Sequence, residues 1–225
     1  YPAKFDYIII HETGHEWWGN SLSIKDLADM WIHEGFCTYT ESLYLECMYG
    51  RQAAFDYLAA YQGGIRNDKP IIGAYGVNNE GSSDMYPKGA VMLHTLRNVV
   101  DDDKLWFATI KSLLEDFKYK TTSTDELVVY MNKKLGKDYT YLFNQYLRFA
   151  EPPMFVYSLW QKGNQIELTY RWKADVKDFK MPLKVGFGKE WQVIEPKAEP
   201  QKILLNGSIE DFKIATDWFY IKTQG

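Results

Sequence analysis

The 225-residue sequence lacks any hydrophobic run near the roughly 20 residues that a membrane-spanning helix needs. It also lacks a basic stripe, since 26 Lys and Arg residues stand against 30 Asp and Glu and the net charge is −4. Nucleic acid is therefore not an expected partner. An initiator Met and a signal-peptide pattern are missing too, so we expect a fragment of a longer protein, and its compartment stays unknown.

Cysteine is scarce as well. The two copies, Cys37 and Cys47, lie on one predicted helix, where ten residues span roughly 15 Å along the axis. A disulfide needs Cα atoms within about 7 Å of each other. We therefore expect two free thiols rather than a disulfide.

The composition that is present fits a soluble globular protein, with 46% hydrophobic and 25% charged residues. Residues 1–150 have the apolar spacing of helices. After Pro152-Pro153 the pattern changes to the alternation of apolar and polar residues that is typical of strands. We expect an α+β protein of two domains, a mainly helical one at 1–150 and a small β-sandwich at 151–225.

Helices and strands can be placed more closely within these two regions. The predicted helices are Phe5 to Trp18, Met30 to Tyr49, Gln52 to Ile65, and about 86–99, 104–119, 124–135 and 140–149. Ser123 and Glu126 form a capping box for the helix at 124–135. The predicted strands are 155–160, 166–172, 183–187, 191–194, 202–205, 212–215 and 218–222, with a hairpin turn at 162–164.

The first helix carries the pattern HExxH, formed by His11, Glu12 and His15. Positions i and i+4 share one face of a helix, so two imidazoles can bind a single Zn²⁺ ion there. Glu12 lies next to that face, within reach of a water molecule at the metal. The pattern alone is weak, because two ordinary histidines on a helix would produce the same match.

A catalytic zinc ion needs a third protein ligand and an open fourth position. Metzincins use a third histidine six residues after the second, but position 21 is Ser and position 18 is Trp. Glu34 instead follows His15 with eighteen residues between them, near the start of the second predicted helix. Two antiparallel helices with a short connection would bring Glu34 back to the metal.

Several segments together resemble the aminopeptidase N and leukotriene hydrolase family of gluzincin zinc metallopeptidases. They are HETGHEWWGN at His11 to Asn20, the eighteen-residue gap, WIHEGF at Trp31 to Phe36, Glu41, and YPKGA at Tyr86 to Ala90. The resemblance covers about residues 1–150, and the expected β-sandwich is similar to a small β domain of some members. It implies a thermolysin-like helical catalytic half whose upstream sheet is not in this sequence.

The chemistry assigns a role to each of these residues. His11, His15 and Glu34 hold one Zn²⁺, which lowers the pKa of water toward roughly 7. Glu12 is the general base that takes the water's proton during attack on a peptide carbonyl. The oxyanion that forms needs a further donor. The resemblance gives this role to Tyr86, which without it would be one more packed aromatic.

Metal-bound histidines usually donate their second ring N–H to a carboxylate or a carbonyl. Glu41 lies two turns after Glu34 on the same helix face and is the first candidate for that acceptor, and Asp29 is the second. A solvated helix carboxylate is the alternative for both. His33 replaces the family's usual Asn and, about 100° around the helix from Glu34, should point away from the metal. His94 is expected to be structural.

One family feature is missing from these residues. The GxMEN segment, with which members recognise the free α-amino group of a substrate, does not occur. The substrate-binding residues therefore stay unknown. The predicted function is zinc-dependent removal of N-terminal amino acids from peptide substrates, with the upstream domains of the parent chain as a further partner. The alternatives are a non-catalytic zinc-binding scaffold and an endopeptidase that uses the same site.

Overall fold

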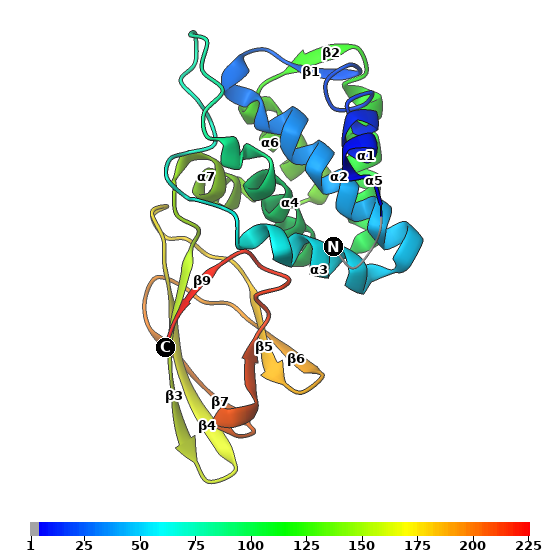
Figure 1. The fold of residues 1–225 in the computed structure, drawn as a ribbon. Coiled ribbons are helices and arrows are strands. Elements are labelled where there is room, and N and C mark those ends of the chain that lie inside the picture. Colours follow the sequence, from blue (N-terminus) through cyan, green and yellow to red (C-terminus); the bar gives the residue numbers. More distant parts are fainter. Residues whose placement is uncertain (1–4) are drawn as a thin grey trace.

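The computed structural model describes residues 5–225 and consists of a helical part, residues 5–150, followed by a sheet part, residues 151–225 (Figure 1). The helical part contains α1 (Tyr7–Gly14), α2 (Trp31–Tyr49), α3 (Arg51–Gln62), α4 (Pro87–Val100), α5 (Asp103–Asp116), α6 (Thr124–Leu135) and α7 (Thr140–Arg148), and two short parallel strands, β1 (Leu22–Ile24) and β2 (Lys120–Thr122). The mixed α+β class agrees with the sequence-based expectation. Within residues 5–225, no helix combines the length and the apolar character needed to cross a bilayer.

The first helix is shorter than predicted. α1 begins at Tyr7 and ends at Gly14, whereas the pattern predicted a helix from Phe5 to Trp18. Beyond Gly14 the chain turns and places the Trp18 ring in the core, with its centroid 4.2 Å from that of Phe36. Burial of this large indole therefore outweighs continuation of the helix. The other six predicted helices are present with ends that differ by at most three residues.

Two local predictions are confirmed. The capping box at the start of α6 is formed, with the Ser123 side chain accepting from the Glu126 backbone and the Glu126 side chain accepting from Ser123. Cys37 is buried, Cys47 is exposed, and both thiols are free.

Two glycines set the approach of α2 and α4. A Cβ atom added at Gly89 would lie only 2.8 Å from the Cα atom of Gly35, and one added at Gly35 would lie 3.1 Å from the Cα atom of Gly89. The two backbones therefore touch at a point that no larger residue permits. This contact lies one residue from Glu34 and three residues from Tyr86, so it fixes the relative positions of these two side chains.

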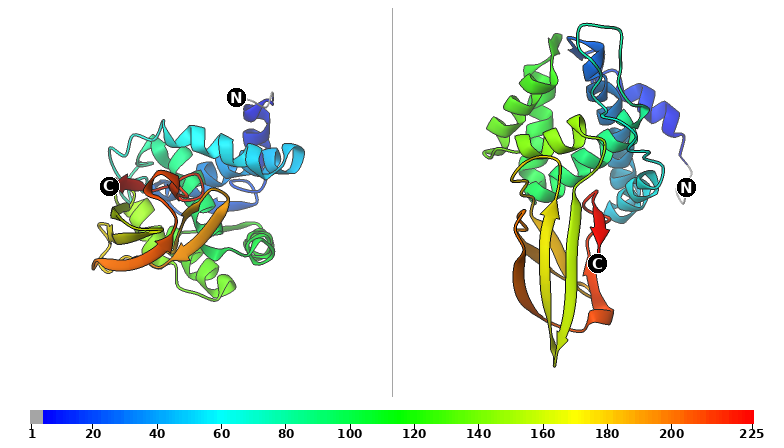
Figure 2. Two further views of the ribbon diagram at one scale, coloured as in Figure 1. Left: turned by 90° about the horizontal axis from the view of Figure 1, so that it is seen from below. Right: turned by 90° about the vertical axis from the view of Figure 1, so that its left-hand side faces the viewer.

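The sheet part contains two sheets that face each other (Figures 1 and 2). The first has the strand order β7-β4-β3-β9, with bounds Gln201–Asn206, Gln165–Lys173, Met154–Lys162 and Lys222–Gln224. The second has the order β6-β5-β8, with bounds Glu190–Ile194, Leu183–Phe187 and Phe212–Ile214. Along β4 the residues Ile166, Leu168, Tyr170 and Trp172 are buried, as their alternation predicted.

The strand predicted at 218–222 is wrong. Residues Phe219, Tyr220 and Ile221 are buried one after another in an irregular segment, and the last strand begins only at Lys222. A strand with one solvated face would bury only alternate residues. Here the segment packs on the helical part: the Tyr220 N–H donates to Thr95 Oγ1 at 2.9 Å, and its carbonyl accepts from Tyr146 at 2.6 Å.

The junction of the two parts contains a buried cation. Lys88, near the start of α4, is fully buried, and its Nζ atom donates to the carbonyls of Phe149 and Ala150 at 2.9 and 2.6 Å. Burial lowers the pKa of this ammonium group to about 8. Lys88 thus ties α4 to the chain segment that leads into β3. The division into two separate domains at residue 150 stays a prediction.

Candidate metal centre

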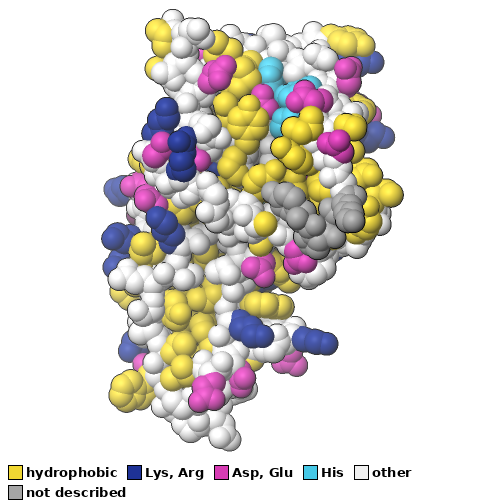
Figure 3. Space-filling view, viewed as in Figure 1, with side chains coloured by type: hydrophobic (Ala, Val, Ile, Leu, Met, Phe, Trp, Pro, Cys, Tyr) yellow, Lys and Arg dark blue, Asp and Glu magenta, His cyan; other side chains and the backbone are white. Residues whose placement is uncertain are grey.

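A cleft of about 350 Å³ opens on the helical part between α1, α2 and α3. The histidine side chains on this face of the molecule are surrounded by acidic side chains (Figure 3). The residues that line the cleft are Tyr7, Ile8, His11, Glu12, His15, Glu34, Thr38, Glu41, Tyr61 and Tyr86. Most of the candidate site residues named from the sequence therefore meet in one place.

Three donor atoms converge in this cleft. His11 lies on α1, and His15 follows one turn later, directly after the end of the helix. Their ring centroids are 5.0 Å apart. The Nε2 atom of His11 lies 3.1 Å from Oε2 of Glu34, and the Nε2 atom of His15 lies 3.5 Å from the same oxygen. Bonds of roughly 2.0–2.1 Å at tetrahedral angles place neighbouring zinc ligand atoms about 3.4 Å apart. The distances from Glu34 Oε2 to the two histidine nitrogens thus fit ligand atoms of a small divalent cation.

The other nitrogen of each imidazole already has an acceptor. His11 Nδ1 donates to Oε1 of Glu41 at 2.7 Å, and His15 Nδ1 donates to the carbonyl of Trp18 at 3.0 Å. When the ring is neutral, these bonds select the tautomer in which Nε2 carries the lone pair that a metal ion would take. Glu41 is itself held by the hydroxyl groups of Tyr57 and Tyr61, the latter at 3.3 Å. Hydrogen bonds of this kind from the second ring nitrogen fix the orientation of histidines that bind metal.

The site favours a positive charge between its carboxylates. Burial opposes a charged His11 ring, but the hydrogen bonds to Glu34 and Glu41 outweigh burial and raise the pKa of His11 to about 9. A metal ion has to displace that proton, because a metal ligand must be the neutral imidazole. The donor set of two nitrogens and one carboxylate oxygen suits such a replacement.

Cys37 is an alternative third donor. Its sulfur and ring nitrogens of His11 and His15 all lie within 4.8 Å of one another, and Cys37 Sγ is 3.3 Å from His15 Nδ1. That nitrogen, however, already faces the Trp18 carbonyl. A thiol binds metal as the thiolate, and burial, followed by the charge of Glu34, raises the pKa of the Cys37 thiol far above its usual range. The geometry and the chemistry both favour Glu34.

Glu12 and Tyr86 both line the cleft that holds this donor set. Glu12 is exposed on α1 and lines the cleft. The Tyr86 ring stacks on that of His11, with centroids 6.0 Å apart, and is 37% exposed. Burial, followed by the negative charge of Glu34, raises the pKa of the Tyr86 phenol. The hydroxyl group therefore stays protonated near neutral pH and can donate a hydrogen bond.

The structure does not bring Asp29 to the histidines. Asp29 is fully buried, and its Oδ1 atom accepts from the hydroxyl groups of Tyr75 and Thr124, each at 2.6 Å. These bonds tie the loop at 67–84 and the start of α6 to the segment that precedes α2. Asp29 thus supports the helix that carries Glu34 rather than a ligand ring.

Two other histidines lie outside the donor set. The Nε2 atom of His33 is buried without a hydrogen-bond partner among residues 5–225, and burial lowers the pKa of its ring. His94 is 2% exposed, and burial lowers its pKa to about 4. Its Nε2 atom lies 3.2 Å from the carbonyl of Asp217, so His94 joins α4 to the sheet part, as expected of a structural residue.

Sequence reasoning missed three groups at the site. They are the carbonyl of Trp18 and the hydroxyl groups of Tyr57 and Tyr61. The i, i+4 spacing of the two tyrosines on α3 was the only available signal. It predicts a shared helix face but not that this face meets Glu41 on α2.

Comparison with known proteins relates the chain to a family of peptidases. The model of the Peptidase family M1 domain matches residues 3–146. Aminopeptidase Ey of Gallus gallus is 25% identical over 146 residues, or 58% of this chain, and endoplasmic reticulum aminopeptidase 2 of Homo sapiens is 25% identical over 144 residues, or 59% of this chain. The chain spans only 15% of the length of each of these relatives.

The fold has a counterpart among solved structures. A crystal structure of Legionella pneumophila aminopeptidase A in complex with aspartic acid aligns with a TM-score of 0.76 over 97% of this chain and 27% of that chain. Its sequence identity to this chain is 12%, so the likeness concerns the fold. The family model covers well over half of the sequence. The matched range includes the proposed metal ligands His11, His15 and Glu34, and also Tyr86. The chain therefore belongs to peptidase family M1.

Proposed function

We propose that the protein that contains this chain is a zinc-dependent aminopeptidase. His11, His15 and Glu34 would hold one Zn²⁺ ion. The observation that carries the proposal is the convergence of these donors at 3.1 and 3.5 Å while the second nitrogen of each ring is already engaged. A set of two imidazoles and one carboxylate suits zinc, whereas magnesium and calcium prefer oxygen donors alone.

The residues around the donors supply the rest of the chemistry. When bound, zinc acts as a Lewis acid that lowers the pKa of water and polarises a carbonyl. Glu12 takes the proton of the attacking water and delivers it to the leaving amine. Tyr86 donates its hydroxyl hydrogen to the developing oxyanion. Glu41 keeps the His11 ring in position through its 2.7 Å hydrogen bond.

The names of the matching relatives support peptides with a free amino terminus as the substrates, because those relatives are named aminopeptidases. The carboxylates that line the cleft, Glu12, Glu34 and Glu41, already have other roles in this proposal. Residues 1–225 do not contain GxMEN, so the proposal places recognition of the α-amine outside these residues.

The test is Glu12→Gln in the whole protein, assayed on an aminoacyl anilide. The amide has the shape of the carboxylate but cannot accept a proton at neutral pH, so turnover should fall on the order of 100- to 10,000-fold while zinc content is unchanged. Glu16→Gln, an exposed position just beyond α1, is the matched control and should turn over normally. Near-normal turnover of Glu12→Gln would exclude the general-base role.

A peptide-cleavage assay of the whole protein separates the aminopeptidase from the endopeptidase and the zinc-binding scaffold. An aminopeptidase cleaves a peptide with a free amino terminus and not its N-acetylated form. Equal cleavage of both peptides would indicate an endopeptidase. Stoichiometric zinc without cleavage of either peptide would indicate a scaffold.

A further inference from the structure

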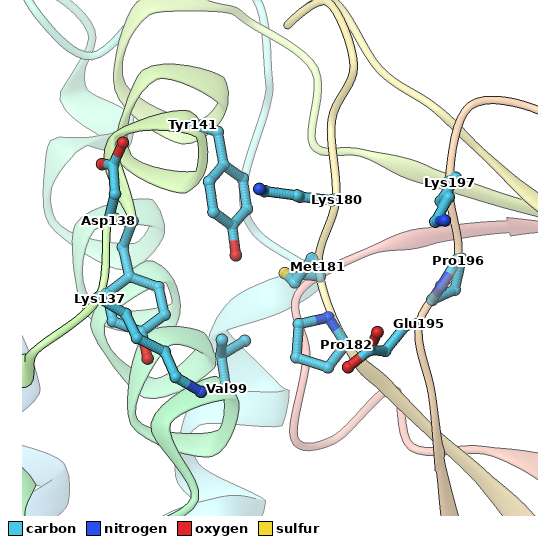
Figure 4. Close-up of a pocket in the computed structure, with 11 residues that line it drawn as sticks. Val99, Lys137, Asp138, Tyr141, Lys180, Met181, Pro182, Glu195, Pro196 and Lys197 are labelled. Atoms are coloured by element: carbon cyan, nitrogen blue, oxygen red, sulfur yellow. The ribbon is translucent and has the colours of Figure 1, made fainter.

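A second cavity, of about 400 Å³, lies between the helical part and the sheet part (Figure 4). It shares no lining residue with the metal cleft. One wall comes from the end of α4, the connection between α6 and α7, and the start of α7. The other comes from the segments that precede β5 and follow β6. The lining residues are Val99, Lys137, Asp138, Tyr139, Tyr141, Lys180, Met181, Pro182, Glu195, Pro196 and Lys197.

Two phenol groups in this cavity have no protein partner. Tyr139 is only 5% exposed and Tyr141 is partly buried, yet neither hydroxyl group makes a hydrogen bond within residues 5–225. Figure 4 shows the Tyr141 hydroxyl pointing into the space beside Met181. Burial raises the pKa of both phenols, so both remain donors. The cavity thus offers two phenol donors that no protein acceptor uses, and the acceptor atoms of a bound ligand can take both hydrogen bonds.

The charges around the cavity are unevenly distributed. Within the part of the chain that the structure describes, Lys137, Lys180 and Lys197 have no carboxylate within 4.0 Å. The Asp138 carboxylate is already engaged, since its Oδ1 atom accepts from the Thr140 backbone and from Asn132 at 2.9 and 3.0 Å. Hydrogen bonds from Thr140, and also the charge of Lys180, lower the pKa of Asp138. The three ammonium groups still outnumber the two carboxylates of the lining, Asp138 and Glu195, so the cavity favours an anion.

The lining also restricts the charge and shape of that anion. The Glu195 carboxylate lies beside Pro182, across the cavity from Tyr141 (Figure 4). It disfavours a second negative charge on the ligand. The buried Met181 and the partly buried Pro182 offer apolar surface beside the charged groups.

We propose that this cavity binds a small monoanionic acid with an apolar body. The acidic group takes the hydrogen bonds of Tyr139 and Tyr141 and the charge of Lys180. The apolar body lies against Met181 and Pro182. This site is separate from the metal centre and does not depend on the proposed peptidase activity.

The probe for this proposal is 3-phenylpropionate, titrated into the 225-residue chain by calorimetry and by NMR. It has an aromatic body and one carboxylate, and we expect a Kd on the order of 1 mM. The uncharged 3-phenylpropanamide should bind at least about tenfold more weakly, because it lacks the charge that strengthens the hydrogen bonds. The cation 3-phenylpropylamine should not bind.

Variants locate the binding. Tyr139→Phe combined with Tyr141→Phe keeps both rings and should weaken 3-phenylpropionate binding about tenfold or more. Tyr119→Phe, an exposed tyrosine outside the cavity, is the control and should bind as wild type. Removal of metal from the protein with a chelator should also leave the affinity for 3-phenylpropionate unchanged, which excludes coordination of the probe carboxylate at the metal cleft.

Three results would overturn the proposal. They are no saturable binding of 3-phenylpropionate at roughly ten times the expected Kd, equal affinity for the acid and the amide, and unchanged affinity of the double Tyr→Phe variant. The one-dimensional NMR spectrum of each variant establishes that it is folded.

Discussion

The helical part and the sheet part fill their interiors with different chemistry. In the helical part, charged and amide side chains are buried, including His11, Asp29, Glu41, Asp84, Lys88, His94, Arg97, Asn98 and Gln145. In the sheet part, which the structure describes throughout, the buried side chains are aliphatic, aromatic and prolyl. Only one of the two parts thus carries the cost of removing charge from water.

The difference indicates which part carries function. Burial of an ion costs several kcal/mol after relaxation, and well-packed apolar residues often stabilise a core as well as a buried ion pair does. Glu41 and His11 are therefore poorly explained by stability alone, and their position beside the metal donors explains them. The sheet part instead supports α4, through contacts such as that of Tyr220 with Thr95.

The largest effect that separates the two parts is expected at Tyr86. Tyr86→Phe in the whole protein keeps the ring that stacks on His11 but removes the hydroxyl group. Because that donor acts mainly in the transition state, turnover should fall on the order of 100- to 1000-fold with little change in apparent affinity. Steady-state kinetics on an aminoacyl anilide measure both.

Tyr170→Phe is the matched change in the sheet part, where Tyr170 is 5% exposed. It should leave turnover unchanged. Turnover of Tyr86→Phe within about threefold of wild type would reduce Tyr86 to a cleft aromatic and remove the functional contrast between the two parts.

A smaller effect is expected at Glu41, which binds His11 but not the metal. Glu41→Gln should lower zinc affinity about tenfold, because the amide is a weaker acceptor for the His11 N–H. Competition with a chromophoric chelator measures the affinity. Glu46→Gln, the same change later on α2, breaks a contact with Arg97 instead and should leave zinc affinity unchanged. Equal loss in both variants would mean that α2 stability, not ring orientation, sets the affinity.

The smallest effect concerns acid stability. Hydrogen bonds from Arg97 hold the pKa of Asp103 below its ordinary value of 3.8, although burial opposes this. A lowered folded-state pKa contributes stability above the unfolded-state pKa, and that contribution is lost as the pH falls through the folded-state value. Since the Asp103 side chain is 43% exposed, we expect less than about 1 kcal/mol.

Thermal unfolding of wild type and Asp103→Asn checks this sign. The wild type should be more stable at neutral pH, and the two curves should converge under strongly acidic conditions. Glu167→Gln is the comparison on the sheet part, where hydrogen bonds from Lys162 and Lys202 lower the pKa of the carboxyl group, and it should show a difference of the same sign. A gap for Asp103→Asn that persists in acid would show that the loss is one of packing.

Periodicity predicted most of the architecture, because the apolar spacing differs clearly between the two parts. It failed where tertiary contacts override local pattern. Trp18 leaves the helix to pack on Phe36. Residues 219–221 are all buried, and the backbone of Tyr220 is hydrogen-bonded to side chains of α4 and α7. Neither contact partner is near in sequence, so no local pattern contains that information.

Part of the candidate site could also be predicted from local spacing, and part could not. Spacing along helices indicated His11, His15 and Glu34, whose donors converge in the cleft, and placed Glu41 on the correct face. The same reasoning offered Asp29 as an acceptor, but its carboxylate faces Tyr75 and Thr124. Which carboxylate reaches a ring depends on the crossing of α1 over α2, which the sequence does not state.

Zinc content of three forms of the chain tests the central claim most directly. Elemental analysis should find one zinc ion per chain in the wild type. It should find most of the metal lost in Glu34→Ala and retained in Cys37→Ala, with circular dichroism establishing that each variant is folded. Full zinc content in Glu34→Ala together with loss in Cys37→Ala would contradict the account and assign the third ligand to the thiol.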